Sequence, residues 1–177
     1  MKPFLSAFLI SVFLVGCSSG VQRPSEPHTR VNLSDKTPLS SVSINLTKEA
    51  KKKATDNLKF NQHRLLDHIK RALEAHSLLE KSPGKESQEL EILVKDMRVR
   101  SNFSAIAFGF MAGADSVTGD IVLKDSLGSE LDRFEVSVSY ALGGLGGGQD
   151  EARMGWLYEK FAEETVNELI GKKRNEK

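Results

Sequence analysis

Cys17 is the only cysteine in this 177-residue chain. A single thiol cannot form a disulfide within the chain, and it cannot build a cysteine-based metal site. In a secreted protein a lone thiol needs another explanation, such as covalent modification. The residues around Cys17 therefore decide what chemistry its sulfur undergoes.

The sixteen residues before Cys17 have the composition of a secretory signal peptide. Lys2 supplies a positive charge, residues 4–15 form an almost continuous apolar run, and Gly16 provides a small residue at the end. The run is too short for a membrane-spanning helix, which needs about 20 residues. We therefore expect residues 1–16 to be removed in the mature protein.

The tetrapeptide Leu14-Val15-Gly16-Cys17 resembles the lipobox of bacterial lipoproteins. The resemblance implies cleavage before Cys17, a diacylglycerol on its sulfur and a fatty acyl group on its new amine. One acyl chain binds a membrane only marginally, whereas three make the anchoring effectively permanent. The alternative is an ordinary signal peptide followed by a chance cysteine.

The residue after the cysteine is Ser18. In lipoproteins of many Gram-negative species, which this segment resembles, an Asp at that position implies retention in the inner membrane. The absence of Asp favours lipid anchoring in the outer membrane, on its periplasmic face. The membrane is then one partner of the protein, reached through the acyl chains on Cys17.

No other residues form a recognisable catalytic or cofactor-binding motif. His63, His68 and His76 are five and eight residues apart, so a helix does not place them side by side as metal ligands, and we expect His76 in the core. The glycine-rich residues 143–148 do not fit a dinucleotide motif, because its last glycine falls on Gln149. We expect no metal, no cofactor and no enzymatic activity. The balance of 25 basic and 24 acidic residues also argues against nucleic acid.

The apolar periodicity predicts an α+β fold in the order β-α-β-β-β-α. Strands are expected over residues 42–46, 89–100, 119–124 and 131–142, and amphipathic helices over residues 56–81 and 150–170. We expect a two-layer sandwich, in which both helices cover one face of a mixed, mostly antiparallel four-stranded sheet. The apolar parity of the second strand switches near Lys95 and Asp96, which predicts a β-bulge there.

Four regions follow from this pattern. Residues 1–16 are the signal peptide, and residues 17–40, which are polar and contain three prolines, are expected to be a lipid-anchored flexible tether. Residues 41–172 form the α+β domain, and residues 173–177 are a basic tail.

Two segments between elements are unusual for loops. Residues 105–114 are apolar and rich in small residues, and residues 143–148 are nearly all glycine. Both should leave the same end of a meander and converge there as an apolar patch. The residues expected to contact a partner are Phe108, Phe110, Met111 and Leu145. The alternatives are that the segments pack on each other, or that the first continues its strands as a hairpin arm.

Trp156 lies off the apolar stripe of the last expected helix. We expect it to pack on the edge of the sheet, with anchoring of a partner as the alternative.

Several stretches carry a resemblance to a known family. They are the helix at residues 65–73, the Gly-Asp-Ile-Val-Leu-Lys-Asp-Ser-Leu-Gly sequence at residues 119–128, and the two glycine-rich segments. Residues 42–171 resemble bacterial envelope lipoproteins of a DUF4410-like family, a domain of unknown function. The arrangement is also similar to the small N-terminal domain of the translocation protein TolB. The resemblance implies binding and scaffolding.

These observations lead to three functional hypotheses. The first is a non-enzymatic lipoprotein, anchored in the outer membrane, that presents a binding or assembly module to the periplasm and meets an envelope protein or a second copy of itself. The second is a carrier of a small apolar ligand or lipid, with a cavity lined by Phe134, Val136 and Phe161. The third is an uncharacterised envelope hydrolase with a carboxylate site.

Overall fold

The computed structural model describes residues 17–25, 30–34, 38–57, 59–80, 88–101, 113–142 and 149–172. These residues form five strands and three helices. In chain order they are β1 (Ser18–Gln22), β2 (Leu39–Leu46), α1 (Lys48–Asp56), α2 (Gln62–Ala75), β3 (Gln88–Arg98), β4 (Asp115–Lys124), β5 (Glu130–Tyr140) and α4 (Asp150–Leu169).

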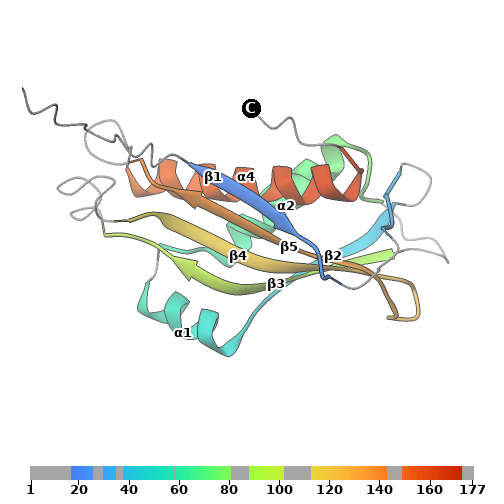
Figure 1. Cartoon of the computed structure of the whole chain (residues 1–177), viewed down its shortest axis with the longest axis horizontal. Coiled ribbons are helices and arrows are strands. Elements are labelled where there is room, and N and C mark those ends of the chain that lie inside the picture. The colour runs from blue at the N-terminus through green and yellow to red at the C-terminus, as the bar shows by residue number, and fades with distance from the viewer. Residues whose placement is uncertain are drawn as a thin grey trace, which may run out of the picture.

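All five strands belong to one mixed sheet with the order β1-β5-β4-β3-β2. β2 pairs with β3 in parallel, and the other three pairings are antiparallel. Helices α2 and α4 lie together along one side of the sheet, whereas α1 lies apart from them beside β3 (Figure 1). The expected α+β class is confirmed.

The core lies between the sheet and the pair α2 and α4. Alternate residues of β5 are buried, including Phe134, Val136 and Val138, because successive side chains of a strand point to opposite faces. In α2 the residues at helical spacing, Leu65, Ile69 and Leu73, are fully buried. The buried residues of β5 and of α2 belong to one continuous hydrophobic cluster.

The expectation of four strands is wrong, because the start of the expected tether forms a fifth strand. β1 pairs antiparallel with β5, with Ser18 opposite Ser139 and Gln22 opposite Glu135. Its side chains add polar contacts, since the Ser19 hydroxyl donates to Glu164 at 2.7 Å. This strand is stabilised by backbone pairing and polar contacts, and its one large apolar residue, Val21, is only partly buried.

The expectation of two helices is also wrong, because the region before residue 62 contains a separate helix. The side chain of Thr47 caps α1 by accepting from the Ala50 N–H at 3.2 Å. Asn61 caps α2 in the same way, through the Arg64 N–H at 3.0 Å. The helix expected from residue 56 therefore begins six residues later, after a turn.

Three local predictions are confirmed. The register of β3 against β4 shifts between Val94 and Asp96, where the bulge was expected. Asp125 accepts backbone N–H groups in the turn between β4 and β5, and Gly128 takes a φ of +84° there. Gly171 ends the last helix with a φ of +69°, a conformation that costs glycine little.

The segment after β1 is tied to the domain through Asp132. This carboxylate is buried in β5, and it accepts from Arg23 Nη1 at 2.7 Å and from the Val31 N–H at 3.3 Å. Glu168 of α4 accepts from Arg23 Nε at 2.7 Å. Arg23 thus contacts both the sheet and α4.

We predict that Asp132→Asn lowers the free energy of unfolding by about 1–3 kcal/mol, because the amide keeps the shape but turns a donor toward Arg23 and Val31. Urea denaturation measures the change. Glu163→Gln is the control, because Glu163 pairs with Lys160 at an exposed position, where the loss should stay below about 1 kcal/mol. Equal losses in the two variants would contradict the prediction.

Candidate functional site

One end of the sheet brings Cys17 and the bases of both glycine-rich segments together. Because β1 and β5 are antiparallel, the first residue of β1, Ser18, lies opposite Ser139 near the end of β5. β4 begins at the same end, with Asp115 opposite Tyr140. We call this the loop end. Figure 1 shows it on the left, where β1 and α4 begin.

Cys17 is exposed at the loop end and directly precedes β1. The next residue is fixed, because the Ser18 and Ser139 hydroxyls lie 2.8 Å apart and form a hydrogen bond. The residue expected to carry the lipid is therefore accessible to solvent, and the sheet begins immediately after it.

An aromatic pair lies beside this position. The rings of Tyr140 and Trp156 are 5.2 Å apart between centroids and tilted by 54°. Both side chains are partly buried against the core. Trp156 thus packs on the sheet, but against β5, which is an interior strand and not the expected edge. Burial raises the pKa of Tyr140, and the electrostatic effect of the nearby Cys17 raises it further. Leu142, two residues beyond, is 50% exposed.

Arg100 joins the bases of the two segments. Its Nη1 donates to the carbonyl oxygen of Gly113 at 2.7 Å, and its Nη2 donates to that of Leu142 at 2.9 Å. Gly113 follows residues 102–112, and Leu142 precedes residues 143–148. The point where the first segment ends therefore lies close to the point where the second begins.

Asp115 supplies the charge that holds this guanidinium. Its carboxylate is fully buried and accepts from the Arg100 backbone N–H at 2.6 Å and from Arg100 Nη2 at 2.9 Å. Arg153 of α4 approaches the same carboxylate, with Nε 3.5 Å from Oδ2, and pairs with Asp150. The sequence offered no signal for this cluster, because its charges come from separate elements and follow no motif.

The residues expected to contact a partner, Phe108, Phe110, Met111 and Leu145, lie outside the described residues. The structure thus places the points where their segments begin and end, and the Cys17 position beside them.

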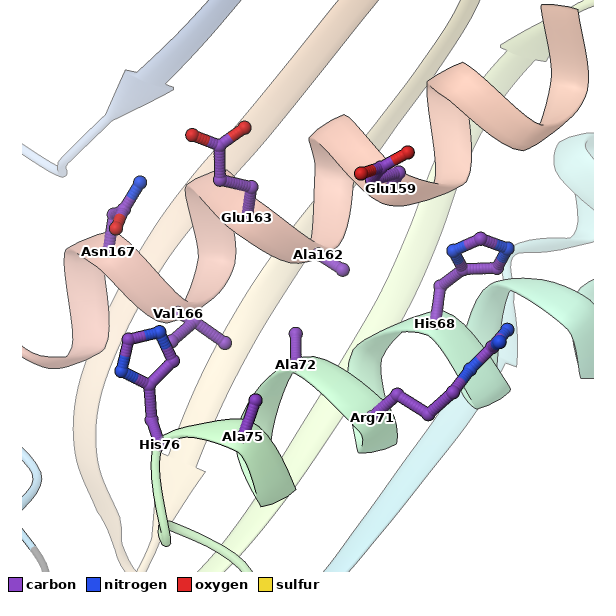
Figure 2. A pocket seen from close by; sticks show the side chains of 10 residues that line it. All are labelled: His68, Arg71, Ala72, Ala75, His76, Glu159, Ala162, Glu163, Val166 and Asn167. Carbon is purple, nitrogen blue, oxygen red and sulfur yellow. The ribbon is translucent and has the colours of Figure 1, made fainter. Parts of the chain in front are cut away.

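A second surface feature is a groove between α2 and α4. It has a volume of about 500 Å³ and a floor that includes Ala72 and Ala162. Figure 2 shows His68 and His76 toward its two ends on α2, and Glu159 and Glu163 along α4. The groove is open to solvent, and its two rims differ in charge.

The three described histidines, His63, His68 and His76, differ in their surroundings. His63 and His76 are exposed, so the expectation of a partly buried His76 is wrong; the residue follows the last turn of α2 rather than continuing its buried stripe. His68 is half-buried with its ring 5.9 Å from that of Tyr158, and burial lowers its pKa. In the described part of the chain, no three His, Cys, Asp or Glu side chains are placed to bind a metal together.

Among the helices that the structure describes, none combines the length and apolarity needed to cross a bilayer.

The described residues form a small α+β domain in which an exposed cysteine directly precedes β1. The family model of a domain of unknown function, DUF4410, matches residues 26–144. The chain belongs to this family, which confirms that part of the resemblance. The search of curated proteins finds no match.

Solved structures with a similar course of the chain are distant in sequence. A PelC dodecamer from Paraburkholderia phytofirmans is 14% identical with a TM-score of 0.47, covering 89% of this chain and 100% of that one. A Xanthomonas campestris protein of the DUF330 family model is 16% identical with a TM-score of 0.42, covering 82% and 90%. The scores are low, and the likenesses carry no conclusion about function.

We predict that Arg100→Met lowers the free energy of unfolding by about 3–5 kcal/mol, because it removes the closest positively charged group from the buried Asp115 carboxylate. Arg100→Lys should recover only part of the loss, because an ammonium cannot reproduce the planar fork. Urea denaturation of both variants measures this. Arg133→Met is the control, since its pair with Glu130 is more than one-third exposed. A loss for Arg100→Met no larger than for the control would rule out the proposed role.

Proposed function

We propose that the protein is a non-enzymatic lipoprotein of the bacterial envelope, anchored through acyl chains on Cys17 to the periplasmic face of the outer membrane. The observation that carries the proposal is the lipobox-like tetrapeptide, which ends at an exposed cysteine where the folded domain begins. An exposed thiol beside the first strand is accessible for acylation. Position 18 is Ser and not Asp, which supports anchoring in the outer rather than the inner membrane.

We further propose that the domain is a binding or assembly module and that the loop end contributes to the contact. Support comes from Arg100, which fixes the bases of two segments whose sequences contain Phe108, Phe110, Met111 and Leu145. The partner is an envelope protein or a second copy of the chain. The similarity to the N-terminal domain of TolB stays a prediction.

The other two hypotheses have less support. Phe134, Val136 and Phe161 are buried in the core, and a methyl group added at Gly119 would lie 3.3 Å from the Phe161 ring, which leaves little room for a ligand there. For a hydrolase, the buried carboxylates of Asp115, Asp132 and Glu164 are held by Arg100, Arg23 and Lys160, respectively. Each of these carboxylates is thus engaged in an ion pair within the fold.

Expression of the full chain in a Gram-negative host tests the anchoring. We predict that the wild-type protein carries a diacylglycerol and an amide-linked acyl chain on Cys17 and that Cys17→Ser carries neither, as intact-mass spectrometry of the purified proteins will show. Ser18→Ala is the matched control and should keep the lipid. A wild-type protein without acyl chains would contradict the lipoprotein proposal.

The Ser18→Asp variant tests the membrane. It should move the lipidated protein from the outer to the inner membrane fraction on a sucrose gradient. If the wild-type and Ser18→Asp proteins are both found in the inner membrane, the outer-membrane assignment is wrong.

Photo-crosslinking in intact cells tests the contact. A photoreactive residue at position 108 or 145 should trap one defined envelope protein or a second copy of the chain. Leu127 is the control position, because it is 90% exposed in the turn at the opposite end of the sheet. Identical products from positions 145 and 127, or none from 108 and 145, would contradict the role of the loop end.

A further inference from the structure

The distance between Cys17 and the folded domain restricts where the domain lies on a membrane. Ser18 is the first residue of β1 and is already paired with Ser139, so no flexible residue separates the acylated position from the sheet. Neighbouring Cα atoms are only about 3.8 Å apart. Acyl chains on Cys17 would hold its backbone at the level of the lipid headgroups, and the groups beside Cys17 would be held there too.

The surface beside Cys17 has the chemistry of a membrane interface. The rings of Tyr140 and Trp156 contact each other in a tilted arrangement, and each combines an apolar ring with a polar group. Such rings concentrate at the headgroup level of bilayers. Leu142 adds an apolar side chain that is 50% exposed. The described residues at the loop end therefore offer an amphipathic surface around the anchor.

The acidic residues at the start of α4 do not oppose this placement. Lys59 pairs with Asp150, and Arg64 pairs with Glu151 at 3.4 Å. Paired charges carry little net repulsion toward the anionic lipids of a bacterial membrane. The opposite end carries the turn between β4 and β5, at a distance of roughly 40 Å along the strands.

Resting on the proposed lipidation of Cys17, we propose that the loop end lies on the bilayer surface, with Tyr140, Leu142 and Trp156 at the headgroup level and the turn at Leu127 directed away from it. The occupant of this surface is the lipid bilayer that holds the anchor.

The single tryptophan of the chain makes the orientation measurable. The lipidated protein is placed in vesicles of phosphatidylethanolamine and phosphatidylglycerol, with and without a nitroxide on the headgroup. We expect the nitroxide to reduce the Trp156 fluorescence by about half, because the ring lies at the depth of the quencher. The matched variant Trp156→Phe with Leu127→Trp moves the probe to the opposite end and should show almost no quenching.

The same measurement separates this inference from the lipoprotein proposal. The chain from Cys17 onward, which contains every residue that the structure describes, is coupled through its single thiol to a maleimide lipid in the same vesicles. The orientation can then be measured even if mass spectrometry finds no natural acyl chains. The proposal of natural lipidation can therefore be wrong while the proposed orientation of the loop end on the bilayer is correct. Quenching of Trp156 well above that of the Leu127→Trp probe supports the inference in either preparation.

Three outcomes would overturn the inference. Equal quenching at both positions means that the domain lies flat, and quenching at neither means that it stands away from the bilayer. An unquenched Trp156, together with crosslinks from residue 145 to a protein, means that a protein covers the loop end instead. As a further check, a flexible Gly-Ser linker inserted between Cys17 and Ser18 should weaken the quenching of Trp156. The insertion changes no residue of the core, so the fold should be unaltered.

Discussion

The carboxylate of Asp115 is fully buried between two buried arginines, and the geometry of the loop end depends on it. Hydrophobic burial alone is non-directional and would let this end of the sheet adopt several arrangements. A buried charge is different, because it must be satisfied by partners in defined positions. Through Arg100 and Arg153, one carboxylate relates the end of β3, the start of β4, the end of β5 and the first turn of α4 to one another.

The sheet face away from α2 and α4 is held by partly exposed ion pairs rather than by a buried charge. On this face, Lys95 of β3 pairs with Asp120 at 2.8 Å and with Glu135, across three strands. Such solvated pairs add little stability, but they keep an uncovered sheet face soluble. Under the proposed placement of the loop end on a bilayer, this face and the groove between α2 and α4 would both face the water beside the membrane.

The sequence predicted those parts of the fold in which apolar periodicity determines the structure. β5 and α4 have clear alternation and a clear stripe, and even the bulge at Lys95 followed from a change of parity. β1 could not be found in this way, because Ser18–Gln22 has one large apolar residue and is held by pairing with β5. α1 consists mainly of charged residues, and its clearest mark is the capping Thr47. The cluster around Asp115 joins residues that are distant in sequence, so only the fold reveals it.

The position of β1 also has a mechanical consequence. Under the proposed anchoring, a force that draws the domain away from the membrane acts on Cys17 and passes along the axis of β1. Because the hydrogen bonds of an antiparallel pair run across the strands, such a force shears all the bonds between β1 and β5 together and does not open them one after another. The side-chain bonds from Ser19 to Glu164 and from Arg23 to Asp132 share the same load. A short polar strand at the edge of a sheet can in this way serve as a strong mechanical attachment.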